Sequence, residues 1–139
     1  MMTTTLLHPE ILSALGSAGH GSRVLIADGN YPFSTGSNPS ARRVYLNLRP
    51  GLVSAVDVLQ TLVSAIPVES AFVMIPDSGP EPEIFGEFRR ILPSGAPVEK
   101  KARFAFYGEA KTPDVALVIA TAEQRVFANI LLVIGVVKP

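Results

Sequence analysis

Gly-His-Gly-Ser-Arg-Val-Leu-Ile-Ala-Asp-Gly-Asn-Tyr-Pro, residues 19–32, is the stretch around which the rest of the chain is organised. Residues 23–27 carry only apolar side chains after Arg23 and lie between glycine-containing segments, which predicts a buried strand. His20 and Asp28 therefore lie in loops at the two ends of this strand. Two glycines flank His20 and leave its ring uncovered. Because an imidazole changes charge near neutral pH, His20 is a candidate for proton transfer.

Length and composition predict one domain, residues 1–139, because 139 residues with 47% hydrophobic content are enough to bury a core. Twelve basic residues balance twelve acidic ones, and no run of like charge is present. We therefore expect no nucleic-acid partner. The chain has no cysteine, which excludes disulfides and thiolate chemistry.

The apolar segments are short, and the longest, residues 130–137, is far below the roughly 20 residues of a membrane-spanning helix. Residues 1–7 lack the pattern of a secretory signal, so we expect a cytoplasmic protein with no membrane partner. The net charge is zero and the mean hydropathy is +0.34. In so small a chain, these values predict that other subunits cover part of the surface in a homo-oligomer.

Strands and helices alternate along the chain, which predicts a layered α/β domain. Helical spacing of apolar residues is clearest in residues 84–92. A capping pattern of Ser54 and Asp57 marks the start of another helix. His8 directly precedes a third helix and is a capping or surface residue. Residues 122–129 suit either a wide hairpin or a connection across the sheet. The predicted helices cover residues 9–18, 54–66 and 84–92, with a helical turn over 103–110, and the predicted strands cover residues 23–27, 43–48, 70–75, 98–101, 115–121 and 130–137.

Few residues are suited to catalysis. One exposed histidine, without cysteine or a carboxylate cluster, does not supply the three or four ligands of a metal site, so we expect no metal. Glycine motifs for phosphates or dinucleotides and the nucleophile elbow of serine hydrolases are absent. The remaining candidates are His20, Asp28, an arginine beside aromatic residues at 103–107, and residues 127–129. Polar groups together with aromatic faces suit a sugar.

Several segments, taken in their order and spacing, resemble the RbsD/FucU family of D-ribose pyranases and L-fucose mutarotases over nearly the whole chain. They are Leu7-His8-Pro9-Glu10, Gly19-His20-Gly21, Ala27-Asp28 with Tyr31-Pro32, Arg49-Pro50-Gly51-Leu52, Arg103-Phe104-Ala105-Phe106-Tyr107, and Asn129-Ile130-Leu131-Leu132 with Gly135-Val136. The segment at 103–107 is similar to the fucose mutarotase branch. The resemblance implies a cofactor-free sugar isomerase with a three-layer α/β fold and a sheet flanked by helices. It also implies rings of about eight to ten subunits, with sugar pockets at or near subunit contacts.

The resemblance also implies roles for single residues. His20 matches the family's general acid, which protonates the ring oxygen of the sugar during anomer interconversion. Asp28, Arg103 and Asn129 match its sugar-binding residues. Phe127 and Tyr107 are candidates for contact with the apolar face of the sugar.

Two positions depart from the family pattern. Phe127 lacks the phenol hydroxyl of the family's tyrosine, and Asn30 stands where fucose mutarotases usually place a second histidine. A sugar-binding protein with little turnover, or a D-ribose pyranase, is therefore the alternative. The residues taken alone also allow structural roles: a turn for His20, a loop cap for Asp28, and a surface or interface charge for Arg103.

Overall fold

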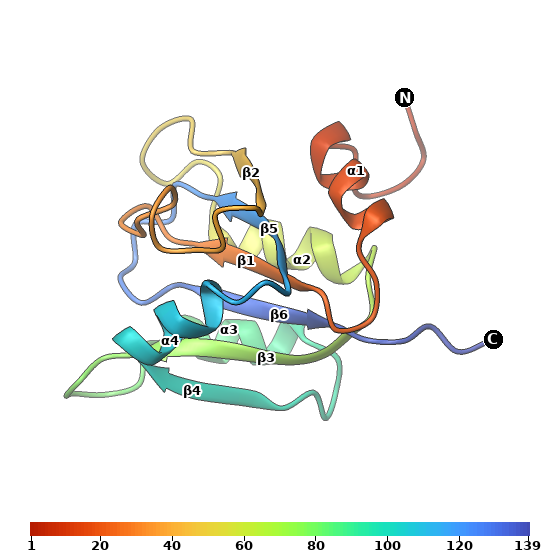
Figure 1. Ribbon diagram of the computed structural model, residues 1–139. Helices are drawn as coiled ribbons and strands as arrows, with labels where there is room; N and C mark the ends of the chain where they lie inside the picture. The colour runs from red at the N-terminus through yellow and green to blue at the C-terminus, as the bar shows by residue number, and fades with distance from the viewer.

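The computed structural model describes all 139 residues and contains one six-stranded sheet (Figure 1). The sheet has the strand order β2-β5-β1-β6-β3-β4. β6 is antiparallel to its neighbours β1 and β3, whereas the other pairs are parallel. Five strands therefore run in one direction and β6 runs in the other. The strands are β1 Arg23–Ala27, β2 Arg42–Tyr45, β3 Val68–Ile75, β4 Val98–Ala102, β5 Val115–Ala120 and β6 Ile130–Ile134.

One end of the sheet collects most of the candidate functional residues. The five parallel strands finish there and β6 begins there, and we call it the carboxyl end of the sheet. Asp28 follows β1, Arg103 follows β4, and Asn129 precedes β6. The strand directions thus bring together residues that are far apart in the chain, in the place where open α/β sheets usually bind ligands.

Helices cover both faces of the sheet, which confirms the expected three-layer arrangement (Figure 1). α1 (Pro9–Ser17), α2 (Ala55–Val63) and α3 (Ile84–Ile91) pack on one face. α4 (Arg103–Ala110) packs on the other face beside the loop that follows β1. The longest helices, α1 and α2, have nine residues each, far fewer than the roughly 20 that a membrane-spanning helix needs.

The central strands are buried on both faces, which explains their uninterrupted apolar sequence. Val24 and Ile26 of β1 contact the core beneath α1, α2 and α3, whereas Leu25 and Ala27 contact the core beneath α4. All four side chains are fully buried. A strand without polar alternation is therefore required here, because successive side chains point to opposite faces.

Local signals in the sequence placed the helix starts correctly. The amide of Asp57 donates to the Ser54 hydroxyl at 3.1 Å and the amide of Ser54 donates to the Asp57 carboxylate at 3.3 Å, which confirms the capping box. The amide of Ile11 donates to Nδ1 of His8 at 3.4 Å, so His8 is the N-cap of α1. The helical turn expected at 103–110 is the two-turn helix α4.

The pairing of distant strands determines the path of residues 122–129 and the ends of β2 and β6, which the sequence did not settle. β5 and β6 lie on opposite sides of β1, so residues 122–129 connect across the sheet and the hairpin alternative is wrong. β2 ends at Tyr45 rather than at residue 48, because the chain turns there and the amide of Leu48 donates to the carbonyl of Leu46. β6 ends at Ile134 rather than at residue 137, because residues 136–139 are exposed and pair with no strand.

Candidate functional site

A pocket of about 250 Å³ lies at the carboxyl end of the sheet. This volume is slightly below the roughly 300–1,000 Å³ of pockets for drug-sized ligands and suits one monosaccharide ring. All five residues that the sequence analysis assigned to substrate binding line this pocket. The lining consists of Asp28, Asn30, Tyr31, Met74, Arg103, Tyr107, Val126, Phe127 and Asn129.

Asp28 and Asn129 form a reciprocal pair in the pocket wall. The amide of Asp28 donates to Oδ1 of Asn129 at 2.7 Å, and Nδ2 of Asn129 donates to Oδ2 of Asp28 at 3.0 Å. The amides of Asn30 and Ala128 also donate to the Asp28 carboxylate, at 2.9 and 3.2 Å. Both side chains of the pair are 3% exposed. The pair therefore fastens the end of β1 to the start of β6. Asp28 thus caps a loop and also lines the pocket.

Burial raises the pKa of the Asp28 carboxyl above its ordinary value, although hydrogen bonds from the amides of Asn30, Ala128 and Tyr31 and from the side chain of Asn129 act in the opposite direction. Oδ1 of Asp28 accepts from the amide of Asn30 at 2.9 Å, and Asp28 lines the pocket. An ionised carboxylate only accepts hydrogen bonds, so a ligand meets Asp28 through its hydroxyl groups. Asp28 thus combines a structural role with one acceptor for a ligand.

Arg103 brings a cation with unused donors to the pocket. Its Nε donates to the hydroxyl of Tyr107 at 3.3 Å, and its guanidinium carbon lies 5.5 and 5.7 Å from the ring centres of Phe104 and Tyr107. Arg103 forms no ion pair with any carboxylate of the chain. Its two terminal nitrogens are therefore available to adjacent hydroxyl groups of a ligand, and its stacking on the aromatic rings restricts its orientation.

Aromatic side chains form the apolar part of the pocket. Tyr31 meets Tyr107 edge to face with ring centres 5.4 Å apart, and its hydroxyl donates to the carbonyl of Gly36 at 2.6 Å. Phe127 has a φ of +58°, the only left-handed backbone among the non-glycine residues. Such a conformation costs an L-residue on the order of 1–3 kcal/mol and is concentrated at functional sites. Phe104 is 79% exposed outside the pocket, whereas Phe106 is fully buried, as expected for a core residue.

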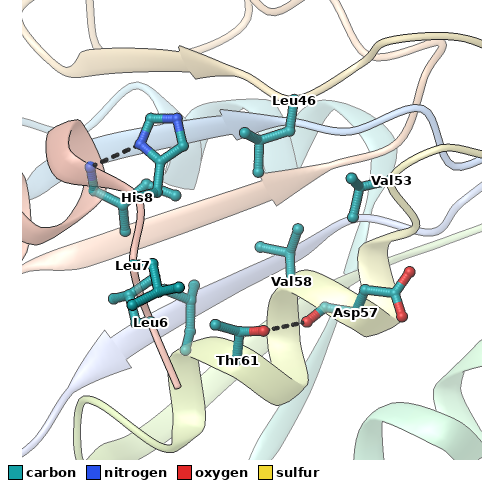
Figure 2. Close-up of a pocket in the computed structure, with 10 residues that line it drawn as sticks. Leu6, Leu7, His8, Leu46, Val53, Asp57, Val58 and Thr61 are labelled. Atoms are coloured by element: carbon teal, nitrogen blue, oxygen red, sulfur yellow. Dashed lines mark hydrogen bonds between the residues drawn. The ribbon is translucent and has the colours of Figure 1, made fainter. Parts of the chain in front are cut away.

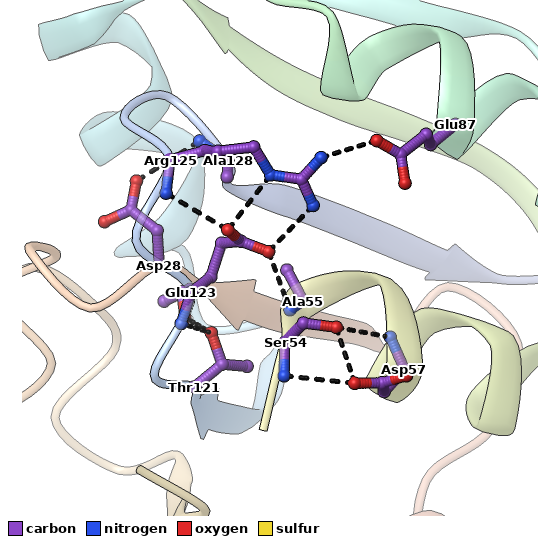
Figure 3. A network of polar contacts seen from close by, with 10 residues as sticks. Asp28, Ser54, Ala55, Asp57, Glu87, Thr121, Glu123, Arg125 and Ala128 are labelled. Carbon is purple, nitrogen blue, oxygen red and sulfur yellow. Dashed lines mark hydrogen bonds and ion pairs between the residues drawn. The ribbon is translucent and has the colours of Figure 1, made fainter. Parts of the chain in front are cut away.

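A network of charges supports the segment that carries Phe127 and Asn129 (Figure 3). Arg125 donates to both carboxylate oxygens of Glu123 at 3.0 Å, and its Nη1 reaches Glu87 of α3. Glu123 is 5% exposed and also accepts from the amide of Ala55, the first residue of α2. These contacts clamp residues 121–129 to α2 and α3. These contacts were not predicted from the sequence, although an acid and a base two residues apart in the segment before Phe127 were the available signal.

The network also fixes the charge of Glu123. Burial raises the pKa of its carboxyl, but the hydrogen bonds and charge of Arg125, with the amide of Ala55, outweigh burial and leave the pKa below its ordinary value. Glu123 is therefore ionised at neutral pH and neutralised by Arg125. It holds the segment in place and has no proton to offer a ligand.

His20 lies outside this pocket, at the opposite end of β1. The loop that carries it is held where β6 finishes, since the amide of Gly21 donates to the carbonyl of Ile134 at 2.9 Å. Nε2 of His20 contacts Oε2 of Glu69 at 2.9 Å, and both side chains are about half exposed. The five residues of β1 separate His20 from Asp28 by roughly 17 Å, at about 3.3 Å per residue. One subunit therefore does not bring His20 to the pocket.

The other histidine of the chain, His8, has a structural role. A narrower, mostly apolar cavity of about 180 Å³ lies between the segment before α1, the end of β2 and α2 (Figure 2). His8 lines it, and Nδ1 of His8 is occupied as the N-cap of α1. The hydroxyl of Thr61 donates to the backbone carbonyl of Asp57 at 2.8 Å within α2. This cavity has few free polar groups and resembles a gap between packed elements.

Comparisons with known proteins agree with the fold. The model of the RbsD / FucU transport protein family matches residues 1–137. A D-ribose pyranase from Symbiobacterium thermophilum is 32% identical over 136 residues, with 98% of each chain covered. A fucose mutarotase from Bos taurus is 37% identical over 146 residues, which cover 96% of this chain and 92% of that protein.

Solved structures are similar over almost the full length. The fucose mutarotase from Streptococcus pneumoniae in complex with L-fucose has a TM-score of 0.84 and 26% identity, with 99% of this chain and 100% of that chain covered. Bacillus subtilis RbsD complexed with D-ribose has a TM-score of 0.85 and 25% identity, with the same coverage. Because the family model spans nearly every residue and both kinds of relative share the fold, this chain belongs to the RbsD/FucU family.

Proposed function

We propose that this protein is a sugar mutarotase, an isomerase that interconverts the α and β anomers of L-fucose or a related monosaccharide. The observation that carries the proposal is the pocket that unites Asp28, Arg103, Tyr107, Phe127 and Asn129. Relatives named D-ribose pyranase and fucose mutarotase support the same class of reaction. A cytoplasmic location, where free sugars are metabolised, is part of the proposal.

The reaction opens and recloses a hemiacetal. The ring oxygen gains a proton while the anomeric hydroxyl loses one, the bond between the anomeric carbon and the ring oxygen breaks, and an aldehyde forms. The aldehyde rotates and the ring closes on its other face, which returns both protons. The step needs a group that donates and accepts protons near neutral pH, and it consumes no oxidant or reductant.

The pocket residues have complementary roles in holding the sugar. The two terminal nitrogens of Arg103 donate to neighbouring hydroxyls, because the planar guanidinium presents two parallel donors. Asp28 accepts from one hydroxyl, and the second hydrogen on Nδ2 of Asn129 donates to another. Phe127 and Tyr107 cover the apolar face of the ring. These contacts orient the anomeric carbon but do not supply the proton.

His20 is the proposed proton donor, and it comes to the pocket from a neighbouring subunit. The pocket of one subunit contains no imidazole, and His20 of the same subunit is about 17 Å away at the other end of β1. His20 is exposed and carries Glu69 as a partner that can orient the ring. A ring of about eight to ten subunits, in which one end of each sheet meets the other end of the next, satisfies this requirement.

Exchange NMR on anomeric protons tests the proposal with a panel that includes L-fucose and D-ribose. The wild type is expected to accelerate exchange for one sugar, and His20→Ala is expected to lose about 10²–10⁴-fold of that rate. His8→Ala is the matched control, because it removes the other histidine at the cap of α1 and should keep the wild-type rate. An unchanged rate in His20→Ala contradicts the assignment of the proton donor.

A sugar-binding protein with little turnover is the second candidate. The observation that favours it is that Phe127 offers no hydroxyl and Asn30 offers no titratable group at the pocket. Ligand-induced shifts without accelerated exchange for any sugar would support it. Phe127→Tyr separates the two candidates further, because a large gain in exchange rate without tighter binding indicates an enzyme that has lost one catalytic contact. Acceleration confined to the ring forms of D-ribose would indicate a D-ribose pyranase instead.

A further inference from the structure

A second, more polar cavity adjoins the sugar pocket and has no role in the proposed reaction. It has a volume of about 390 Å³ and lies at the ends of β1, β2 and β5. Asn30 lines both cavities, so the two lie next to each other on either side of this residue. Only one of its nine lining residues is hydrophobic, in contrast to five of nine in the sugar pocket.

Backbone hydrogen bonds hold the walls of this cavity together. The amide of Gly29 donates to the carbonyl of Glu123 at 2.9 Å, and the amide of Gly51 donates to the carbonyl of Ala122 at 2.8 Å. The amide of Ala122 in turn donates to the carbonyl of Val53 at 2.9 Å. The loops after β1 and β2 are therefore attached to the segment after β5. The cavity is a defined part of the fold at the carboxyl end of the sheet.

The residues that line this cavity include side chains with unused donors and one positive charge without an ion-pair partner. Asn30, Asn47, Arg49 and Gln124 form no side-chain hydrogen bond within the chain, and Arg49 forms no ion pair. Glu123 is the only carboxylate in the lining, and Arg125 already neutralises it. An arginine surrounded by free amide groups is suited to phosphate or carboxylate, because its planar fork matches their oxygens.

We propose that this cavity binds an anionic substituent of the sugar held in the adjoining pocket, with Arg49 as the main contact. The inference rests on the proposed function and adds to its substrate class a preference, among monosaccharides, for those that carry a phosphate or carboxylate. The anomeric carbon of such a sugar has to be free, because mutarotation opens the hemiacetal there. The anion is therefore attached at a carbon remote from the anomeric centre, and Asn30 lies between the two parts of the ligand.

Calorimetric titration tests the proposal with matched probes: D-galactose, D-galactose 6-phosphate and D-galacturonate, D-ribose and D-ribose 5-phosphate, and inorganic phosphate alone. At least one anionic sugar is expected to bind ten-fold or more tightly than its neutral parent. The phosphate and carboxylate probes distinguish the two anions. Arg49→Gln is expected to remove this preference and leave the affinity for the neutral sugar unchanged. Arg90→Gln on α3 is the control, because Arg90 is also exposed and forms no ion pair but lies outside both cavities.

Equal affinity for charged and neutral sugars, or an anion preference that survives in Arg49→Gln, overturns the proposal. Binding of inorganic phosphate through Arg49 without any gain for the sugar phosphates also overturns it, since the anion is then bound independently of a sugar. Exchange NMR separates this failure from failure of the proposed function. If neutral sugars exchange in a His20-dependent manner but anionic sugars bind no more tightly, only the anion site is refuted. If anionic sugars bind through Arg49 but no sugar shows accelerated exchange, only the mutarotase activity is refuted.

Discussion

Mixing two inactive variants should restore activity if each site takes His20 from one subunit and Arg103 from the next. His20→Ala removes the proton donor and Arg103→Gln removes the sugar-binding fork. Both side chains are exposed, so both variants should fold. Within one subunit, the length of β1 separates the two ends of the sheet by roughly 17 Å, whereas proton transfer requires contact at about 3 Å. Activity in the mixture can therefore come only from sites formed between different subunits.

The expected recovery follows from random assembly. A shared site is intact when its histidine comes from an Arg103→Gln subunit and its pocket comes from a His20→Ala subunit. In an equal mixture each condition holds for half of the sites, so about a quarter of all sites are intact. The variants are co-expressed with different affinity tags, mixed oligomers are isolated through both tags, and anomer exchange is measured by NMR. His20→Ala alone should retain about one per cent of the rate or less, because it removes the proton donor. Arg103→Gln alone should show strongly reduced exchange, because it removes the donors that hold the sugar.

A second mixture serves as the control, in which wild-type subunits are combined in equal amounts with subunits that carry both substitutions. About a quarter of all sites in this mixture should be intact if each site is shared between two subunits, and about half if each subunit forms its own site. No recovery in confirmed mixed oligomers of the two single variants, together with half activity in the control, refutes the shared site. A monomeric protein with full activity refutes it as well.

Three further substitutions test the supports of the pocket. Arg125→Gln should lower the free energy of unfolding by about 1–3 kcal/mol at pH 7, less than for a fully buried pair because Arg125 is 44% exposed. The depressed pKa of Glu123 stabilises the wild type above the unfolded-state pKa of about 4.5, and this gain is lost as pH falls through the lower folded-state pKa. The difference in stability between Arg125→Gln and the wild type should therefore shrink in an acid denaturation series. Asp28→Asn should cost about 1–3 kcal/mol, because an amide oxygen replaces a carboxylate that accepts three donors. Since burial raises the pKa of Asp28, the wild type loses stability as pH rises through that value, and this slope should vanish in Asp28→Asn. Gly36→Ala should cost about 1–3 kcal/mol and weaken sugar binding, because its Cβ would lie 2.7 Å from Pro32 and 3.1 Å from the ring of Tyr31.

Chemical denaturation and sugar titration check these expectations. Gly16→Ala is the matched control for Gly36→Ala, because nothing lies within 4 Å of the new methyl group and Ala is favoured over Gly in a helix. Equal stability of Arg125→Gln and wild type at pH 7 contradicts the clamp on residues 121–129. A pH slope in Asp28→Asn that matches the wild type contradicts the assignment of the raised pKa.

Much of the site was predictable because the residues that form it are marked by local patterns. Asp28 follows an apolar strand, Arg103 begins a segment rich in aromatics, and Asn129 precedes the last strand. The resemblance to the RbsD/FucU family identified the same residues as sugar-binding, and all of them line one pocket. The pairing of Glu123 with Arg125, two residues apart, had a signal in the sequence, but the contact of Arg125 with Glu87 had none, because it spans 38 residues.

The sequence by itself determined the apolar strands, the caps at His8 and Ser54, and the residue types suited to a sugar, because these depend on neighbours within a few positions. Only the tertiary structure decided that β1 lies between β5 and β6, and that β6 alone runs in the opposite direction. Strand order and direction are set by contacts between distant segments that share a core. That arrangement places Asp28 and Asn129 side by side and puts His20 at the far end of the same strand, which makes a second subunit part of the proposed mechanism.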